Sequence, residues 1–243
     1  MADLFYGSGL DNKKNKQHRA ELHVITQNLQ GFKKERRSGW LRGWKQRTSL
    51  RPADVIYVQD THLKTSEEID EVAEMWNRVW GIKEPKQPLS YWSKMEGSSG
   101  CIGILLQPNI AAQVSPWRPS EWTGRRIGLR FREWTLVNIY APTDRKAQRS
   151  FYSDLQSWIS KVKLLLLGGD FNAVLQPSLD RIINGLPSAK SCESVELDRL
   201  VDQLDLLDAV QLTTHANEDS VPDPLTHLVF GESSLQAGWI TSI

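Results

Sequence analysis

The feature that most constrains the fold is a short apolar run that ends abruptly in polar residues. Residues 164–172 read Leu-Leu-Leu-Leu-Gly-Gly-Asp-Phe-Asn. An apolar run this short, bounded by turn-forming residues, is typical of a strand that is buried on both faces. Asp170 and Asn172 follow directly at its end. Because Gly, Asp and Asn also favour turns, this segment taken alone leaves a simple turn as an alternative.

Three other strand-like segments end in the same way. The first runs from Leu22 into Asn28, the second from Asp54 into Asp60, and the third from Thr135 into Tyr140. Loops held by a rigid sheet are where binding and catalytic residues concentrate. Four strands that each end in Asn, Asp or Tyr therefore predict a shared polar cleft above a sheet, which a set of unrelated turns does not explain.

Strand and helix patterns alternate along the rest of the chain. A capping box at Thr65–Glu68 opens one amphipathic helix, a second is predicted over 144–161, and a third over 193–204. At 243 residues, without internal repeats or linkers, the pattern indicates one α/β domain over 21–243, preceded by a disordered polar tail over 1–20.

Charge is distributed unevenly, although the net charge is only +1. Residues 1–60 carry twelve Lys and Arg against six Asp and Glu, whereas residues 181–243 carry three against ten. A basic first quarter is suited to a polyanion. Cys101 and Cys192 form no metal or disulfide pattern, which favours an intracellular setting. No run approaches the roughly 20 apolar residues that span a bilayer, so no membrane partner is expected.

Five short motifs in this order resemble the endonuclease/exonuclease/phosphatase superfamily, and most of all the apurinic-type endonuclease domain of LINE-type (non-LTR) retrotransposons. They are Thr26-Gln27-Asn28-Leu29-Gln30-Gly31, Gln59-Asp60-Thr61-His62-Leu63, Ser99-Gly100-Cys101-Ile102-Gly103-Ile104, Asn138-Ile139-Tyr140-Ala141-Pro142 and Gly169-Asp170-Phe171-Asn172-Ala173-Val174-Leu175. The resemblance implies a DNase-I-like, four-layer α-β-β-α sandwich of two mixed, mostly antiparallel sheets. It also implies cleavage of phosphodiesters with Mg²⁺ or Mn²⁺.

The resemblance also assigns roles to the residues at the strand ends. Asp60 is the first metal-ligand candidate and Asn28 the second, since hard cations take oxygen ligands. Asp170 is the candidate that accepts the proton of an attacking water, and Asn172 orients the water or the phosphate. Tyr140 is the third catalytic candidate, as a hydrogen-bond donor to the scissile phosphate.

Further residues are expected in supporting and binding roles. Asn138 and His62 are supporting candidates, and alternation along the chain places His62 on the same side as Asp60. We expect DNA phosphates to be contacted by four cations, namely Arg125, Arg126, Lys33 and Lys34. The domain is expected to act as a monomer on the DNA backbone, inside the cell and in the nucleus if it belongs to an active element.

The sequence departs from the superfamily pattern at two points. Asp60 stands where related proteins usually carry Glu, and the Ser-Asp-His block that ends the superfamily pattern does not occur in the sequence. We therefore expect the domain to be truncated at its C-terminus, and its ancestral DNA-nicking activity to be impaired. Two alternatives stay open: a phosphoesterase of the same fold acting on a small phosphate ester or lipid head group, and a non-catalytic remnant that binds nucleic acid.

Overall fold

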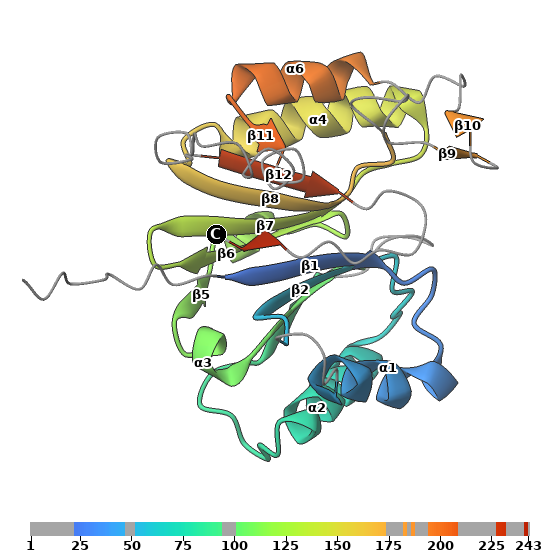
Figure 1. Ribbon diagram of the computed structural model, residues 1–243, viewed down its shortest axis with the longest axis vertical. Helices are drawn as coiled ribbons and strands as arrows, with labels where there is room; N and C mark the ends of the chain where they lie inside the picture. Colours follow the sequence, from blue (N-terminus) through green and yellow to red (C-terminus); the bar gives the residue numbers. More distant parts are fainter. Residues whose placement is uncertain are drawn as a thin grey trace, which may run out of the picture.

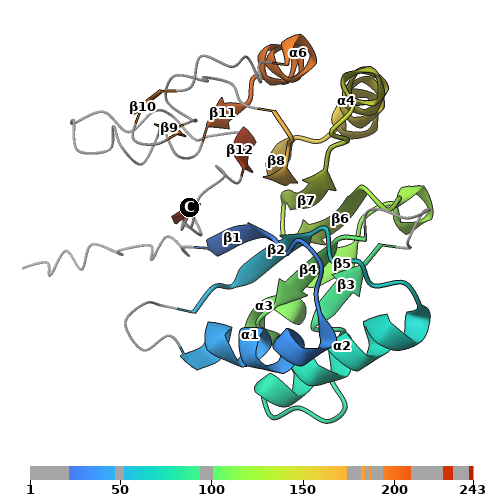
Figure 2. The ribbon, with the colours of Figure 1, turned by 90° about the vertical axis from the view of Figure 1, so that its right-hand side faces the viewer.

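The computed structural model describes residues 22–46, 52–93, 101–173 and 194–208, together with four short backbone segments at 182–183, 186–187, 227–231 and 241–242. Two sheets pack face to face, and helices cover the outer face of each (Figures 1 and 2). The predicted four-layer α/β sandwich is thus confirmed. The tail predicted over 1–20 lies outside the described residues.

The first sheet has five strands in the order β13-β1-β2-β4-β3. Their bounds are β1 His23–Asn28, β2 Val55–Gln59, β3 Ser90–Trp92, β4 Gly103–Leu106 and β13 Thr241–Ser242. β1 and β2 are parallel, with Asn28 opposite Gln59, and the other pairings are antiparallel. The parallel pair matters for function, because it brings the carboxyl ends of both strands to one edge.

The second sheet has six strands in the order β11-β12-β8-β7-β6-β5. Their bounds are β5 Val114–Pro116, β6 Arg126–Phe131, β7 Trp134–Tyr140, β8 Leu164–Asp170, β11 Leu207–Asp208 and β12 His227–Gly231. β7 and β8 are parallel, with Tyr140 opposite Asp170. The leucine run is β8, and its interior residues are buried as predicted. A separate two-stranded pair joins β9 (Ile182–Ile183) to β10 (Leu186–Pro187).

The helices begin where the sequence supplies caps. α2 (Ser66–Val79) is capped by the Thr65 side chain, α4 (Arg145–Ile159) by Asp144, and α6 (Val195–Gln203) by Ser194. α1 (Lys34–Gln46) and α2 cover the first sheet, and α4 and α6 cover the second (Figures 1 and 2). Two shorter turns are α3 (Pro108–Ala111) and the 3₁₀ helix η1 (Pro119–Glu121).

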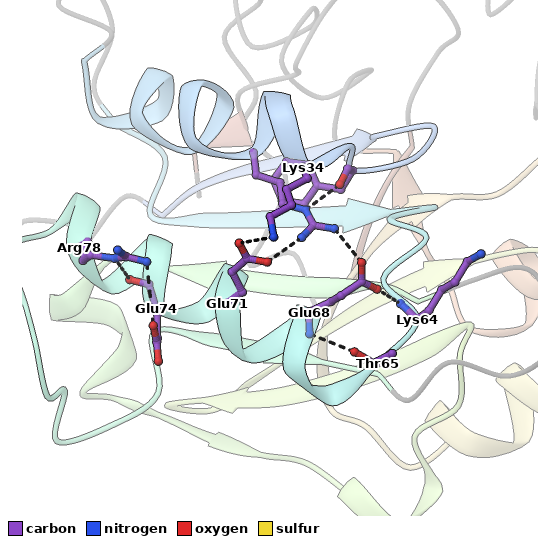
Figure 3. Close-up of polar contacts among 9 residues, drawn as sticks. Lys34, Lys64, Thr65, Glu68, Glu71, Glu74 and Arg78 are labelled. Carbon is purple, nitrogen blue, oxygen red and sulfur yellow. Dashed lines mark hydrogen bonds and ion pairs between the residues drawn. The ribbon is translucent and has the colours of Figure 1, made fainter.

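A buried arginine joins α1 to α2. Arg37 is 4% exposed, donates from Nε to the Phe32 carbonyl at 2.8 Å, and pairs with Glu68 and Glu71 at 3.3 Å each. Glu68 Oε2 also accepts the Lys64 backbone N–H at 2.6 Å (Figure 3). The capping box is therefore confirmed in part: Thr65 accepts from Glu68, whereas Glu68 reaches back one residue further than the motif predicts.

Contacts between elements also determine where α1 and β12 form. α1 begins at Lys34, and the Arg37 contacts order its first turn. β12 forms near the C-terminal end of the sequence and pairs in parallel with β8. Strand propensity depends strongly on the neighbouring strand, and β8 offers β12 a buried apolar partner.

Candidate active site

The four predicted strand ends meet at one edge of the sandwich. Asn28 ends β1, and Asp60 follows β2 by one residue in the same sheet. Tyr140 and Asp170 end β7 and β8 and are register partners in the other sheet. Each sheet therefore contributes two polar side chains, and the contacts below show that the two pairs meet.

Asn28 and Asp170 bridge the two sheets directly. Asn28 Nδ2 donates to Asp170 Oδ2 at 2.7 Å, and Asn28 Oδ1 accepts the Gln30 backbone N–H at 2.9 Å. The backbone contact fixes which way the Asn28 amide faces, so its NH₂ group is held towards the carboxylate. Asn28 thus orients Asp170, and its contact with a metal ion stays a prediction.

Asp60 and Tyr140 form the second contact between the sheets. Burial, the negative charge of Asp60, a hydrogen bond to Asp60 and the charge of Asp170 together raise the pKa of Tyr140 to about 12, while Arg125 opposes this shift. A phenol with this pKa stays protonated at neutral pH. Tyr140 is therefore a hydrogen-bond donor between two carboxylates.

The segment after β2 is a tight corner that turns Asp60 and His62 to the same side. Both residues have positive φ, +52° and +56°, a conformation that most side chains avoid. Backbone hydrogen bonds hold the corner, since Asp60 and Thr61 carbonyls accept from Gly31 and Phe32 at 2.8 and 2.7 Å. His62 Nε2 lies 3.0 Å from Asp60 Oδ1. The predicted placement of His62 beside Asp60 is what the structure shows.

Asn172 closes a turn around Asp170. Its backbone N–H donates to Asp170 Oδ1 at 2.9 Å, and its Nδ2 donates to the Ala141 carbonyl at 2.7 Å. Asp170 therefore accepts one hydrogen bond on each carboxylate oxygen, which fixes its plane. Each oxygen keeps a second lone pair for a water or a metal ion.

Asn138 lies beneath the site and not within it. It is fully buried between the sheets, where its amide contacts Gln59, Val58 and Gly103. The structure gives this supporting candidate an inter-sheet position two residues before Tyr140.

The predicted DNA-contacting cations are separated by the fold. Arg125 donates from Nη1 to the Tyr140 carbonyl at 3.1 Å, and its guanidinium lies over the Tyr140 ring. Arg126 faces the opposite side of β6, with its guanidinium 4.9 Å from the centre of the Trp158 ring of α4. Lys33 is exposed, and Lys34 pairs with Glu71 of α2 at 3.4 Å (Figure 3). The structure thus brings Arg125 into the site and turns Arg126 and Lys34 towards other elements.

The donor set is suited to a hard divalent cation bound with few protein ligands. Asp60, Asp170 and Asn28 offer only oxygen donors, and the two carboxylates share Tyr140 as a neighbour. Within the described parts of the chain, no group of three or more His, Cys, Asp or Glu side chains is arranged to hold a metal ion. Mg²⁺ is commonly held by one or two carboxylates, substrate phosphates and water, and the residues present fit that mode.

Two glutamines that were not predicted as site residues support the site. Gln59 contacts Asn138 at 2.7 Å, and Gln148 of α4 donates from Nε2 to the carbonyls of Pro142 and Asn172 at 2.8 and 3.0 Å. Gln59 could have been noticed as a polar residue inside an otherwise apolar strand. Gln148 carries no such signal, because a glutamine on an amphipathic helix is ordinary.

The architecture is similar to that of solved nucleases. A 3'-5' exonuclease from Neisseria meningitidis superposes with a TM-score of 0.51 at 15% identity, covering 75% of this chain and 70% of that chain. An AP endonuclease from Leishmania major also gives 0.51 at 13% identity, covering 76% and 67%. The chain therefore shares the α/β-sandwich fold of these two nucleases. In this fold the residues described above occupy the edge where β1, β2, β7 and β8 end.

The sequence is also similar to a transposon protein. Transposon TX1 uncharacterized 149 kDa protein of Xenopus laevis is 27% identical over 166 residues, which is 63% of this chain and 11% of that protein. No family model matches the chain. Among the helices that the structure describes, none has the length and apolar character needed to cross a membrane.

Proposed function

We propose that this chain is a metal-dependent phosphodiester hydrolase that nicks DNA, and that it derives from the endonuclease of a retrotransposon. The observation that supports this most directly is the inter-sheet contact of Asn28 with Asp170, next to the Asp60–Tyr140 pair. Two carboxylates, a neutral phenol and an oriented amide at one sheet edge are suited to attack on a phosphodiester. The similarity to the transposon protein from Xenopus laevis supports the retrotransposon origin. We propose that the protein acts in the nucleus if it belongs to an active element.

The proposed reaction is a direct displacement by water. The water oxygen forms a bond to phosphorus, and its proton passes to Asp170, which Asn28 and the Asn172 backbone hold in place. The ester P–O bond breaks, and the leaving oxygen becomes a 3′-hydroxyl by taking a proton from solvent. Tyr140 would turn its single O–H from Asp60 to the phosphate, and Asp60 and Asn28 would hold Mg²⁺ or Mn²⁺. The bound ion would supply charge neutralisation at the phosphate.

DNA is the proposed substrate because the cations near the site suit its backbone. Arg125 lies over Tyr140, and Lys33 is exposed just after β1, at the start of the basic helix α1. In the proposed complex Arg125 and Lys33 bind neighbouring phosphates of the DNA backbone, and a third phosphate lies at Asp170. A monomeric domain is sufficient for this arrangement, since each residue named comes from one chain.

The test is a supercoiled-plasmid nicking assay with Mg²⁺ or Mn²⁺. We expect slow nicking by the wild-type chain and none by Asp170→Asn or Asp60→Asn. Asp154→Asn is the matched control, because Asp154 is exposed on α4 and its substitution should leave the nicking rate unchanged. Nicking that is absent from the wild type, or that persists in both site variants, would overturn the proposal. The slow rate expected for the wild type stays a prediction that the same assay tests.

A further inference from the structure

Directly beneath the candidate site, two amide side chains meet between the sheets. Gln59 at the end of β2 donates from Nε2 to Asn138 Oδ1 of β7 at 2.7 Å. Both side chains are 0% exposed. They form a polar contact inside an otherwise apolar interface, which contains neighbours such as Tyr57 and Leu136. We refer to the Gln59–Asn138 contact as the amide bridge.

The surroundings fix the orientation of both amides. Asn138 Nδ2 faces two backbone carbonyls, Val58 at 3.1 Å and Gly103 at 2.8 Å, so the NH₂ group must point to them. Its oxygen therefore faces Gln59, which must present an NH₂ group in turn. The second N–H of Gln59 reaches Thr26 Oγ1 of β1 at 3.0 Å. All four amide protons are used, and the chain of contacts links β1, β2, β4 and β7.

This orientation leaves one acceptor without a partner. Gln59 Oε1 is buried and has no hydrogen bond within the part of the chain that the structure describes. A buried acceptor without a partner costs stability, and two apolar side chains of similar volume would avoid that cost. Buried polar contacts can instead specify one arrangement of packed elements. The position of the amide bridge, between β2 and β7 and beside the site residues, indicates that it specifies how the two sheets are aligned at the site.

Each end of the bridge lies next to a site residue. Gln59 directly precedes Asp60, and its backbone carbonyl accepts the Leu29 N–H at 2.9 Å, beside Asn28. Asn138 lies two residues before Tyr140, on the same face of β7. The bridge therefore fixes β2 against β7 just below the Asp60–Tyr140 contact. A small slide of one sheet over the other at this level would separate Asp60 from Tyr140 and Asn28 from Asp170.

We propose that the Gln59–Asn138 amide bridge is a positioning device that sets the separation of Asp60 from Tyr140 and Asp170 across the two sheets. Its effect on catalysis rests on the proposed function, whereas its effect on the corner after β2 does not. Gln59 and Asn138 are positioning residues, since both are buried and act through their neighbours.

The first experiment measures backbone hydrogen exchange and needs no activity. Gln59→Met keeps an apolar side chain of similar length and removes the bridge. We expect the amides of Leu29, Gly31 and Phe32, which hold the corner, to exchange about five- to tenfold faster relative to those of β6, as for one lost hydrogen bond. Leu155→Ala is the control: it opens the fully buried core under α4 and should leave this ratio unchanged. An unchanged ratio in Gln59→Met would overturn the proposal.

A milder variant tests the proposal if Gln59→Met does not fold. Thr26→Val removes only the acceptor for the second Gln59 N–H and keeps the shape of the side chain. It should raise the same exchange ratio by a smaller factor. If Gln59→Met does not fold and Thr26→Val leaves the ratio at the wild-type value, the bridge does not position the corner.

The second experiment measures the consequence at the site. In Gln59→Met we expect kcat for plasmid nicking to fall about tenfold with KM unchanged, and Mg²⁺ to bind about tenfold more weakly in a calorimetric titration of the metal alone, as for the loss of supporting contacts around a metal site. Leu155→Ala should change neither. If the wild type shows no nicking and no Mg²⁺ binding, the proposed function fails and the exchange ratio still decides the bridge. A raised exchange ratio with wild-type kcat and Mg²⁺ affinity would contradict the positioning role.

Discussion

Replacing Gly169 by Ala should both destabilise the fold and displace the carboxylate that follows it. Gly169 has a φ of +138°, and an added Cβ would lie 2.0 Å from the Ile139 carbonyl oxygen and 2.8 Å from the Ile139 nitrogen. These are backbone atoms of the paired strand β7, so no side-chain rotation relieves the clash. β7 and β8 must separate at the level of Tyr140 and Asp170, which follow Ile139 and Gly169 in the register.

Two contributions determine how much Gly169→Ala lowers the free energy of unfolding. The strained φ costs about 1–3 kcal/mol, and one lost ladder hydrogen bond costs about 1 kcal/mol. Together they lower the free energy of unfolding by about 3 kcal/mol. With a urea m-value of about 3 kcal/mol/M, the unfolding midpoint should fall by about 1 M.

The assay is urea unfolding followed by tryptophan fluorescence, with a second glycine as the control. Gly39 lies exposed in α1, and a Cβ there would meet nothing within 4 Å. Gly39→Ala should therefore stabilise the protein by up to about 1 kcal/mol, because glycine is unfavourable inside a helix. A Gly169→Ala midpoint equal to that of the wild type would refute the reasoning on β8.

Three further predictions concern the site and the caps. The pKa of Tyr140 is raised to about 12 in the folded protein, whereas in the unfolded chain the phenol loses its proton near pH 10. The preference of the folded state for the protonated phenol therefore stabilises the protein below pH 10, and this stabilisation is lost as the pH rises from about 10 to about 12. Urea midpoints across that range should fall less steeply in Tyr140→Phe than in the wild type, and equal slopes would contradict the shift. Asn28→Ala removes the 2.7 Å contact with Asp170 and should slow nicking about tenfold or more, so a wild-type rate would show that Asp170 needs no such support. Thr65→Ala should lower the free energy of unfolding by about 1 kcal/mol, measured by urea unfolding, and an unchanged midpoint would exclude a capping role.

Much of the site could be predicted from the sequence, because strand ends follow simple rules. The leucine run predicted a buried strand, and β8 is buried along its interior. Polar residues at the carboxyl ends of parallel strands must share an edge, so Tyr140 and Asp170 follow from the pairing of β7 with β8. The same reasoning places Asn28 beside the corner that holds Asp60.

The remainder could not be predicted, because it depends on how separate elements pack. Arg125 and Arg126 are adjacent and identical in type, yet strand alternation sends one to Tyr140 and the other to Trp158. Which of them faces the site depends on which face of β6 is covered by α4. Sequence alternation shows that the two differ, and it does not show which is which.

On the outer face of β6, two arginine side chains pack against tryptophan rings. Arg126 and Arg130 flank Gly128 on one face, and their guanidiniums lie over Trp158 and Trp117. A Cβ at Gly128 would lie 2.8 Å from the Trp117 ring and 3.2 Å from the Trp158 ring, so glycine makes room for both indoles. The two arginines are therefore occupied in packing α4 and the β5–β6 edge. Arg126 therefore has a packing role against α4, and its contact with DNA phosphate stays a prediction.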